Sequence, residues 1–370
     1  MKIAFFGSSI LSSYWNGAAT YYRGLLKALA DIGHDVTFYE SDAYERQLHR
    51  DIEPPRWARV VVYTADDTGE LDECLAAASR ADVVVKASGV GVFDEYLEKR
   101  VPRLRPGQIS LFWDVDAPAT LDRLARASHA GRADPLRRQI PRFSAVLTYG
   151  GGDRVTEKYL QFGARHCQPI YNAVDPDTHH PTAVDPVFSS DVSFLGNRLP
   201  DREARVEEFF LTASQQLPDR RFLLGGSGWS GKLLPANVRD IGHVSTEQHN
   251  AFNSSAAFVL NINRESMASW GFSPPTRVFE AAAAGACLIT DEWPGIETFF
   301  RPGTEVLTAR SGMDVCSIVQ AISRERAREI GSAARTRVLR DHTYALRAEQ
   351  VTGLLERLRT KAGCAEAVAV

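Results

Sequence analysis

Short apolar runs alternate with helical patterns along most of this 370-residue chain. Each run is bounded by polar or turn-forming residues, and several are separated by segments with helical periodicity, such as Thr20–Asp31. This alternation is typical of a parallel sheet covered by helices, so the predicted fold class is α/β. The runs in the first half are Lys2–Phe6, Asp35–Tyr39, Val60–Tyr63, Val83–Lys86, Ile109–Phe112 and Ala145–Thr148.

The alternation is interrupted once and then resumes. Residues Gln168–Pro186 contain four prolines and no periodicity, which indicates a linker. We therefore expect two α/β domains, residues 1–172 and 173–341, a division that also suits the length. From Asp314 to about Lys361 the chain is predicted to be mostly helical. The second set of strands is expected at Val192–Leu195, Phe222–Leu224 and Phe258–Ile262, with helices at Arg202–Gln216 and Thr246–Ser254.

Charge, cysteine and histidine content exclude several classes of protein. The formal net charge is −3, so there is no basic excess to neutralise a nucleic-acid backbone. The five cysteines are scattered and form no CxxC pair, so neither a disulfide framework nor a zinc site is predicted. The adjacent His179 and His180 would point apart in an extended linker, so both are predicted to be solvated. No stretch approaches the ~20 apolar residues of a membrane span, and we expect a protein of the reducing cytoplasm.

The segment from Ser273 to Asp291, SPPTRVFEAAAAGACLITD, predicts a helix followed by a buried strand. Ser273 is expected to cap the helix, with Pro274 or Pro275 at the first helical position. Gly285 is expected to end the helix, and residues 286–290 to form the strand.

This helix start predicts a binding site for a nucleoside diphosphate. Free N–H groups at the start of a helix, together with the helix dipole, attract an anion, which assigns Ser273 and Thr276 to phosphate binding. Glu280 lies four residues after Thr276 on the same face, where its carboxylate can accept hydrogen bonds from the hydroxyls of a sugar. A diphosphate linked to a ribose is therefore the predicted ligand.

Two loops after strands of the first half carry further candidates. The first, GSSILSSYWNGA, lacks the GxGxxG fingerprint, but Gly17 would allow a ligand to approach the backbone. A plain surface loop is the alternative. The second, LFWDVDAPAT, places Asp114 and Asp116 directly after a buried strand, where a carboxylate can act as general base on an acceptor hydroxyl. An aspartate before Ala-Pro also forms ordinary turns, so a purely structural role stays open.

Two glycine-containing loops follow strands of the second half. In FLGNRLPDR, Gly196 gives a ligand access, and Arg198 can pair with a diphosphate and stabilise it as it leaves. Arg198 can equally be an ordinary surface arginine near a helix start. In LLGGSGW, Gly226 makes room for a ligand and Trp229 offers a flat surface beside a nucleotide base.

Several of these segments resemble those of a known family. GFSPPTRVFEAAAAGACLITD, GIETFFRPGTEVL and DHTYALRAEQ resemble the CgeB-like glycosyltransferases of the GT-B fold, and TYGGG, YNAVDPDTHHP, SFLGNR and LGGSGW fit the same family in order. The resemblance implies two Rossmann-like domains facing each other across a cleft, with the C-terminal helix, about residues 342–362, crossing back to the first domain. It implies transfer of a sugar, of the hexosyl type, from a nucleotide-diphosphate sugar to an unidentified acceptor, with no bound metal or cofactor.

The resemblance also implies roles for individual residues. Glu280 occupies the position whose carboxylate commonly contacts the donor ribose in retaining members of the fold, and Arg277 binds phosphate or braces the helix. The second glutamate of the retaining pattern, eight residues earlier, is Phe272 here, so retention or inversion stays open. Two other functions also remain: a non-hydrolysing nucleotide-sugar epimerase on the same fold, and a non-catalytic nucleotide-sugar-binding protein.

Overall fold

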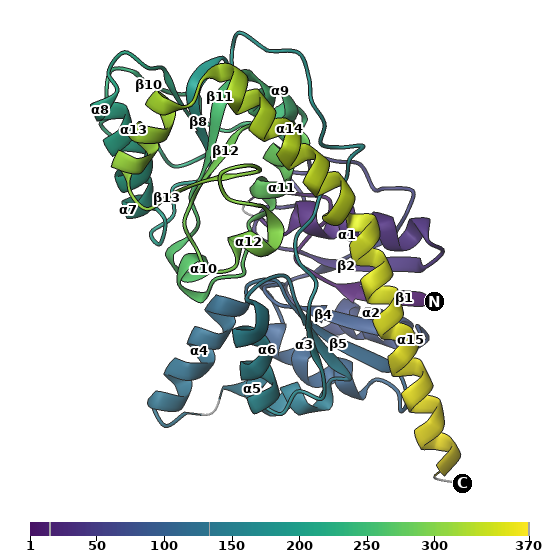
Figure 1. Cartoon of the computed structure of the whole chain (residues 1–370). Helices are drawn as coiled ribbons and strands as arrows, with labels where there is room; N and C mark the ends of the chain where they lie inside the picture. The colour runs from purple at the N-terminus through teal and green to yellow at the C-terminus, as the bar shows by residue number, and fades with distance from the viewer. Residues whose placement is uncertain (15, 133, 369–370) are drawn as a thin grey trace. The chain divides into compact units, whose positions relative to one another are not determined.

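The computed structural model describes residues 1–14, 16–132 and 134–368, and the chain divides into two compact units. The first unit holds Met1–Tyr171 and the chain from Tyr344 onward, and the second holds Asn172–Thr343. Along the sequence, the second unit is thus inserted into the first (Figure 1). Each unit contains one parallel sheet, as the alternating sequence pattern predicts.

The first unit is built on a seven-stranded sheet in the order β3-β2-β1-β4-β5-β6-β7, in which every neighbouring pair is parallel. Its central strand β4 is buried along its whole length, as expected for a strand with helices over both faces of its sheet. The strands are β1 (Lys2–Phe6), β2 (Asp35–Asp42), β3 (Arg59–Thr64), β4 (Val83–Ala87), β5 (Ile109–Asp114), β6 (Ala145–Thr148) and β7 (Cys167–Pro169). The helices are α1 (Ala19–Asp31), α2 (Gly69–Ala78), α3 (Asp94–Arg100), α4 (Ala117–His129), α5 (Pro135–Gln139), α6 (Gly152–Gln161) and α15 (Tyr344–Val368).

The second unit is built on a six-stranded parallel sheet in the order β10-β9-β8-β11-β12-β13. Its strands are β8 (Ser190–Leu195), β9 (Phe222–Gly225), β10 (Val238–Asp240), β11 (Ala256–Asn261), β12 (Leu288–Asp291) and β13 (Leu307–Ala309). Its helices are α7 (Glu203–Val206), α8 (Thr212–Gln216), α9 (His249–Ser255), α10 (Glu265–Trp270), α11 (Thr276–Ala283), α12 (Ile296–Phe299), α13 (Gly312–Ala321) and α14 (Arg324–Asp341). A π-helical turn, Glu207–Leu211, joins α7 to α8.

Both sheets follow the same path. The chain starts in the middle, at β1 or β8, moves strand by strand to one edge, and then continues on the other side of the first strand at β4 or β11. This is the Rossmann-type order, in which ligands bind beyond the carboxyl ends of the strands, beside the point where the direction of winding reverses. In the second unit this point lies beyond the ends of β8 and β11.

The strand after α11 begins later than predicted. β12 spans Leu288–Asp291 and does not begin at Ala286. The N–H groups of Gly285 and Ala286 donate back to the carbonyls of Ala282 and Ala281, each at 3.0 Å. This Schellman motif, with Gly285 in the left-handed region (φ 76°), uses both residues to end the helix, so the prediction that Gly285 closes it is confirmed.

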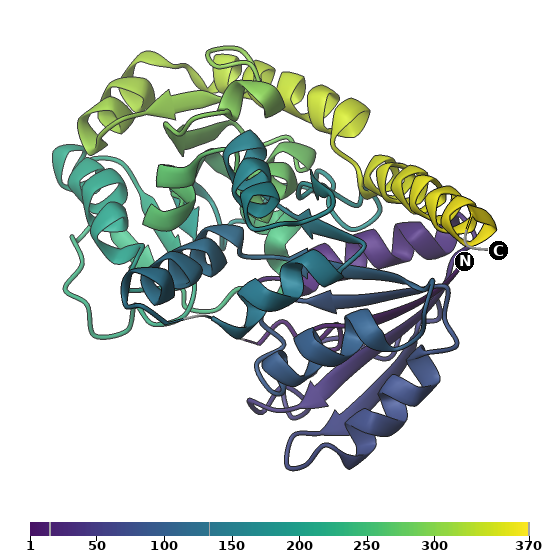
Figure 2. The same cartoon turned by 90° about the horizontal axis from the view of Figure 1, so that it is seen from below.

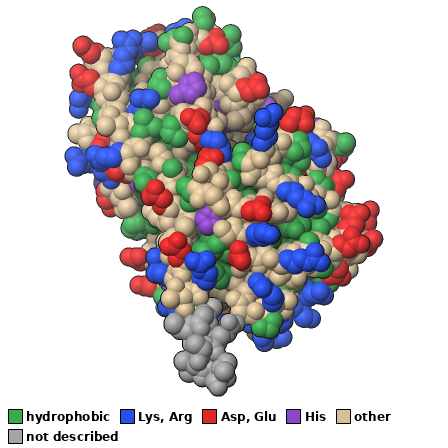
Figure 3. Space-filling view, turned by 90° about the vertical axis from the view of Figure 1, so that its right-hand side faces the viewer, with side chains coloured by type: hydrophobic (Ala, Val, Ile, Leu, Met, Phe, Trp, Pro, Cys, Tyr) green, Lys and Arg blue, Asp and Glu red, His purple; other side chains and the backbone are tan. Residues whose placement is uncertain are grey.

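Charged side chains of both signs are interspersed over the face shown in Figure 3, in keeping with the balanced composition. Over the described residues, no helix combines the length and the apolar character needed to cross a membrane. The four cysteines whose side chains are described are buried, and their thiols are free.

The C-terminal helix packs against the first helix of the same unit. α15 lies alongside α1 in both views (Figure 1, Figure 2). Tyr344, the first residue of α15, is buried, and its ring meets that of Tyr21 edge-on with centroids 6.0 Å apart. Gly24 faces Tyr344 so closely that a Cβ atom at Gly24 would lie 2.1 Å from Cδ2 of the tyrosine ring. This packing therefore requires glycine at position 24.

We expect Gly24→Ala to lower the free energy of unfolding by about 1–3 kcal/mol, the usual cost of overpacking a well-filled core. Gly353→Ala on α15 is the control, since the nearest atom to its Cβ would be Nη1 of Arg357, 3.5 Å away. That exchange should be neutral or raise stability by up to about 1 kcal/mol through helix propensity. Urea unfolding of both variants measures the difference, and equal values for the two would contradict the packing described.

Candidate functional site

Arginines and carboxylates gather at the carboxyl ends of β8, β11 and β12 in the second unit. Asp291 ends β12 and is fully buried. Its carboxylate accepts from Nη2 of Arg205 (2.6 Å) and from the backbone N–H of Asn263 (3.1 Å), just after β11. Burial raises the pKa of Asp291, while the ion pair with Arg205 acts against that rise. These contacts fix the loop after β11 to the end of β12.

Arg202 and Arg277 bring positive charge to the same region. Nε of Arg202 and Nη1 of Arg277 are buried and have no hydrogen-bond partner among the described residues. Burial, with repulsion from Arg277 and Arg264, lowers the pKa of Arg202 to about 10, and burial also lowers the pKa of Arg277. Neighbouring guanidiniums with unused donors suit an anion. Sequence analysis missed Arg202, which it took only as the first residue of a helix that in fact begins at Glu203.

The start of α11 differs from the sequence prediction. Pro275 is the N-cap, with extended backbone (φ −68°, ψ 153°), and the helix begins at Thr276. The prediction that Ser273 caps the helix is wrong, because Oγ of Ser273 donates to the carbonyl of Gly271 (2.9 Å) instead. Each proline disfavours helical backbone in the residue before it, so Ser273 and Pro274 stay extended and the helix cannot begin before Pro275. No side chain caps α11. The N–H of Val278 donates to the carbonyl of Pro275 (3.1 Å), which leaves the N–H groups of Thr276 and Arg277 available to an anion.

Asn172 holds this helix start in place. Its Nδ2 donates to the carbonyl of Pro274 (3.0 Å), and its Oδ1 accepts from Oγ1 of Thr276 (3.2 Å). Asn172 is buried, although sequence analysis assigned it only to the linker. The hydroxyl of Thr276 is therefore engaged within the protein, while its backbone N–H belongs to the uncapped first turn.

Glu280 lies one turn further along α11 with only 3% of its surface exposed. Its two carboxylate oxygens lie 3.7 Å from Nε2 of His179 and 3.7 Å from Nδ1 of His249. Burial alone would raise the pKa of Glu280, but His179, His249 and Arg277 outweigh burial and hold that pKa below its usual value. Glu280 is therefore an ionised hydrogen-bond acceptor at neutral pH, close to the uncapped helix start.

The prediction that His179 is solvated is wrong. Its ring is 2% exposed, and neither ring nitrogen has a hydrogen-bond partner among the described residues, whereas His180 is exposed. The linker packs against the rest of the second unit, where the N–H of His180 donates to Oδ1 of Asn250 (3.2 Å). The side chain of His179 therefore faces inward, and that of His180 faces solvent. His249 carried no signal in the sequence, and burial lowers its pKa to about 4. Within the described part of the chain, no group of three or more His, Cys, Asp and Glu side chains is placed to bind a metal ion.

Gly196 and Gly226 allow two loops of the second unit to pack against each other. Gly226 has φ 121°, and a Cβ atom there would lie 2.3 Å from the carbonyl oxygen of Gly196. The same oxygen accepts from Nε1 of Trp229 (2.8 Å). Trp229 is buried in the core of the unit, so the prediction that its ring borders a base is wrong. These contacts explain why glycine is needed at both positions, and the explanation requires no bound ligand.

Arg198 belongs to an ion-pair network. Its Nη2 lies 2.7 Å from Oε1 of Glu203, and Nζ of Lys232 lies 2.8 Å from the same oxygen. Hydrogen bonds from Arg198 and Lys232 lower the pKa of Glu203 to about 2. A diphosphate would therefore have to compete with Glu203 for Arg198, whereas Arg202 and Arg277 have no ion-pair partner within the described residues.

In the first unit, Asp114 ends β5 and is fully buried. Its Oδ1 accepts from Oγ of Ser88 (2.7 Å), Oγ1 of Thr120 (3.1 Å) and the N–H of Asp116 (3.1 Å), and its Oδ2 accepts from the hydroxyl of Tyr159. Asp116 occupies the N-cap position of α4, but its side chain does not cap that helix. Of the two candidate carboxylates, only Asp116 has exposed surface.

The loop before Gly17 has a fixed shape. Oγ of Ser9 donates to Oε1 of Glu40 (2.9 Å), and the N–H of Ile10 donates to Oε2 of Glu40 (2.8 Å). Nδ2 of Asn16 donates to the carbonyl of Ser9 (2.8 Å) and closes the loop. Gly17 follows in an exposed turn, where a Cβ atom would meet no atom within 4 Å. The space beside Gly17 is therefore open, and Glu40, which sequence analysis missed, orders the loop that leads to it.

The second unit is similar to glycosyltransferases in sequence. Residues 202–353, which include Arg202 and the whole of α11, match the family described as glycosyl transferase-like. No curated protein matches the chain in sequence.

Solved structures with the same architecture cover almost the whole chain. Sucrose-phosphate synthase from Thermosynechococcus elongatus covers 98% of this chain and 100% of its own, with a TM-score of 0.71 and 15% identity. HepE of Anabaena, in complex with UDP and glucose, covers 96% and 100%, with a TM-score of 0.66 and 14% identity. A glycosyltransferase involved in avilamycin A biosynthesis covers 98% of each chain, with a TM-score of 0.59 and 18% identity. The fold is therefore GT-B, which confirms the predicted fold class.

Folding stability is expected to fall as the pH decreases from 7 toward 5. The pKa of His249 is about 4 in the folded protein and about 6.5 in an unfolded chain, so the unfolded state takes up the proton first. The stabilisation is complete above about pH 6.5 and lost below about pH 4, and it is worth about 3 kcal/mol in full. Urea unfolding at several pH values from about 5 to 7.5 measures the slope.

His249→Gln should flatten this slope, whereas His180→Gln should leave it unchanged because that ring is exposed. Glu280 acts in the same direction, since its lowered pKa gives stability that is lost as the pH falls below about 4.5, which is why the measurement stays above pH 5. An identical slope in the wild type and in His249→Gln would contradict the neutral, buried state of this histidine.

Proposed function

We propose that this protein is a glycosyltransferase that moves a hexose-type sugar from a nucleotide-diphosphate sugar to an acceptor. The family match over residues 202–353 and the GT-B fold support this class of reaction. Uridine diphosphate is the first nucleotide to test, because HepE was solved with UDP and glucose. We further propose a cytoplasmic enzyme of the CgeB-like family, on the sequence segments that resemble that family.

The uncapped start of α11 beside Arg202 and Arg277 is the observation that carries the proposal. Breaking a sugar–diphosphate bond develops negative charge on the leaving group, and preorganised donors are the strongest means of lowering that barrier. Two guanidiniums with unused buried donors and the first N–H groups of α11 supply positive charge at one place. We propose that these groups, without a bound metal ion or cofactor, bind the diphosphate, so EDTA should leave turnover unchanged.

Two carboxylates complete the proposed mechanism. Glu280, ionised and one turn into α11, is proposed to accept hydrogen bonds from the ribose hydroxyls of the donor. Asp116 is proposed as the general base that removes a proton from the acceptor hydroxyl. Asp114 is proposed to position Asp116, because its carboxylate accepts from the Asp116 N–H (3.1 Å) and from three side chains.

Incubation with UDP-glucose alone separates the two other candidate functions. An epimerase would convert the sugar in the absence of any acceptor, and a binding protein would leave the donor intact. A transferase is expected to release UDP slowly, by transfer of the sugar to water, and faster once a suitable acceptor is added. If no nucleoside diphosphate binds in calorimetry, the proposed function is overturned.

Arg202→Gln should weaken the binding of UDP about 10- to 100-fold, the cost of losing a hydrogen bond to a charged group. Arg198→Gln is the comparison variant, because Arg198 is already paired with Glu203 at 2.7 Å and a diphosphate must displace that carboxylate. The expected loss for Arg198→Gln is therefore smaller than for Arg202→Gln. Calorimetric titration with UDP measures the affinity of both variants. A larger loss for Arg198→Gln than for Arg202→Gln would show that the diphosphate binds Arg198 and not Arg202.

The contact between Glu280 and the ribose can be isolated by changing both partners. Wild-type protein should bind UDP about 10-fold or more tightly than 2′,3′-dideoxy-UDP, since a hydrogen bond to a carboxylate is worth about 1.5–3 kcal/mol. In Glu280→Gln this preference should largely disappear. A variant that keeps the full preference for the ribose hydroxyls would show that they bind elsewhere, even if its overall affinity falls.

A further inference from the structure

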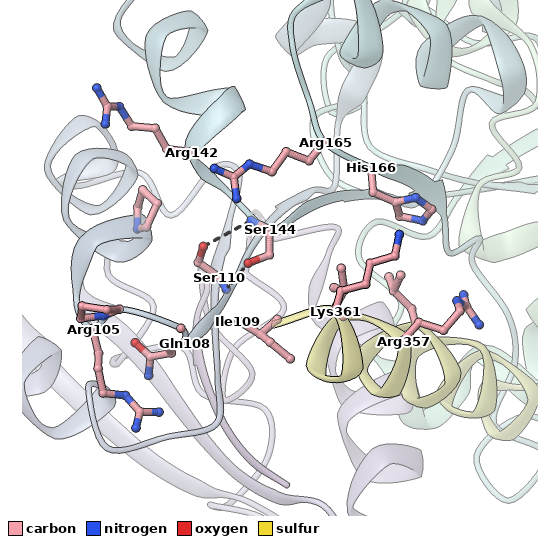
Figure 4. A pocket seen from close by; sticks show the side chains of 15 residues that line it. Arg105, Gln108, Ile109, Ser110, Arg142, Ser144, Arg165, His166, Arg357 and Lys361 are labelled. Carbon is pink, nitrogen blue, oxygen red and sulfur yellow. Dashed lines mark hydrogen bonds between the residues drawn. The ribbon is translucent and has the colours of Figure 1, made fainter. Parts of the chain in front are cut away.

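A second concave site lies in the first unit, at the opposite end of its strands from Asp114. It is a groove of about 470 Å³ at the amino ends of β5, β6 and β7. Ile109 is the first residue of β5, Ser144 directly precedes β6, and His166 directly precedes β7. The middle of α15 forms the remaining wall through Arg357 and Lys361 (Figure 4). Four segments far apart in the sequence therefore build this groove.

The charged side chains that line the groove are all basic. They are Arg105, Arg142, Arg165, Arg357 and Lys361. Among the described residues, no carboxylate lies within ion-pair distance of any of the five. Like charges that lie close together without counter-charges repel one another. A bound anion would relieve this repulsion, so the groove favours anions.

Backbone contacts hold two of these guanidiniums in position. Nε of Arg165 donates to the carbonyl of Pro141 (3.1 Å), and Nη2 of Arg105 donates to the carbonyl of Ala81 (3.1 Å). Each guanidinium keeps further N–H donors for a ligand, since arginine has five. Arg165, His166 and Lys361 lie around one space, while Arg105 and Arg142 lie at its outer rim (Figure 4). Arg165 and Lys361 are therefore the cations best placed to share one anion.

Hydroxyl groups and apolar side chains line the rest of the groove. Oγ of Ser144 accepts from the N–H of Ser110 (3.1 Å), which leaves the Ser144 hydroxyl proton free to donate to a ligand (Figure 4). The half-buried Leu358 supplies apolar surface, and the buried Ile109 and Leu354 lie beneath it in the floor of the groove. A volume of about 470 Å³ is in the range of sites for small organic ligands. The groove thus offers cations and hydroxyls on one side and apolar surface on another.

We propose that this groove binds a phosphorylated small molecule, a phosphate monoester whose phosphate lies between Arg165 and Lys361 and whose apolar body lies against Ile109, Leu354 and Leu358. β5 is six residues long, so about 17 Å of strand separates the groove from the carboxyl end that carries Asp114. A ligand here does not reach those candidate catalytic carboxylates. The bound ligand would contact both α15 and the sheet, and it would therefore stabilise the packing of α15 in the first unit.

Calorimetric titration with 1-naphthyl phosphate tests the proposal on the full-length protein. The wild type should bind this probe more tightly than inorganic phosphate, because only the ester has an apolar body. The double variant Arg165→Gln, Lys361→Gln should bind it at least 10-fold more weakly. Arg359→Gln is the matched control, since it removes an exposed cation from α15 that does not line the groove, and its affinity should equal that of the wild type.

A variant of the second unit shows which site the probe occupies. Arg202→Gln should keep the wild-type affinity for 1-naphthyl phosphate, because that residue lies in the proposed donor site and not in the groove. If Arg202→Gln abolishes binding of the probe and the double variant does not, the proposal is overturned, whatever the outcome for UDP. An affinity that is unchanged in the double variant, or no binding by the wild type, overturns it as well.

Vesicles of phosphatidylglycerol distinguish a free phosphate ester from a lipid headgroup. The proposal expects the wild type and the double variant to sediment equally with these vesicles, while only the wild type binds 1-naphthyl phosphate. If the double variant loses vesicle binding but keeps its affinity for the soluble ester, the groove is a membrane contact and the small-molecule site is excluded.

Discussion

The extended Pro274-Pro275 pair is the constraint on which the donor side of this molecule depends. Because each proline keeps the residue before it out of the helical region, α11 cannot begin before Pro275, and Ser273 lies too far back to cap a helix that begins at Thr276. An uncapped helix start and two arginines with unused buried donors are unfavourable for an unliganded fold. Unfavourable groups of this kind are common at sites where a bound ligand offsets their cost. Here they lie beyond the strand ends, where proteins of this topology bind their ligands.

Glu280 balances that positive charge from within the same helix. Its carboxylate is almost wholly buried, yet the histidines beside it and Arg277 hold its pKa below the usual value. The linker supplies one of these histidines and α9 the other, so the segment that begins the second unit also tunes the electrostatics of α11. Cationic groups and an anionic carboxylate thus lie within one turn of each other on α11.

Sequence reasoning was most accurate where the signal was local. Apolar runs predicted the longer strands of both sheets, whereas the three-residue strands β7, β10 and β13 were not predicted. The motif at Gly285 was predicted because the end of a helix depends on a few adjacent residues. It missed Arg202, Asn172 and His249, since their roles arise from contacts between segments far apart in the chain. Two predictions were wrong because a local rule was applied alone. The predicted Ser273 cap ignored the proline pair that follows it, and the predicted exposure of His179 ignored the packing of the linker against the rest of the second unit.

The return of α15 to the first unit has a consequence for biosynthesis. Tyr21 and Tyr344 pack together, yet the whole second unit is translated between them. While the ribosome makes residues 172–343, the surface of α1 around Gly24 has no helix to cover it, so that apolar strip stays exposed until α15 is made. The second unit, by contrast, is contiguous and can complete its core before the first one does. Loss of α15 by premature termination would thus damage the half of the protein made earliest.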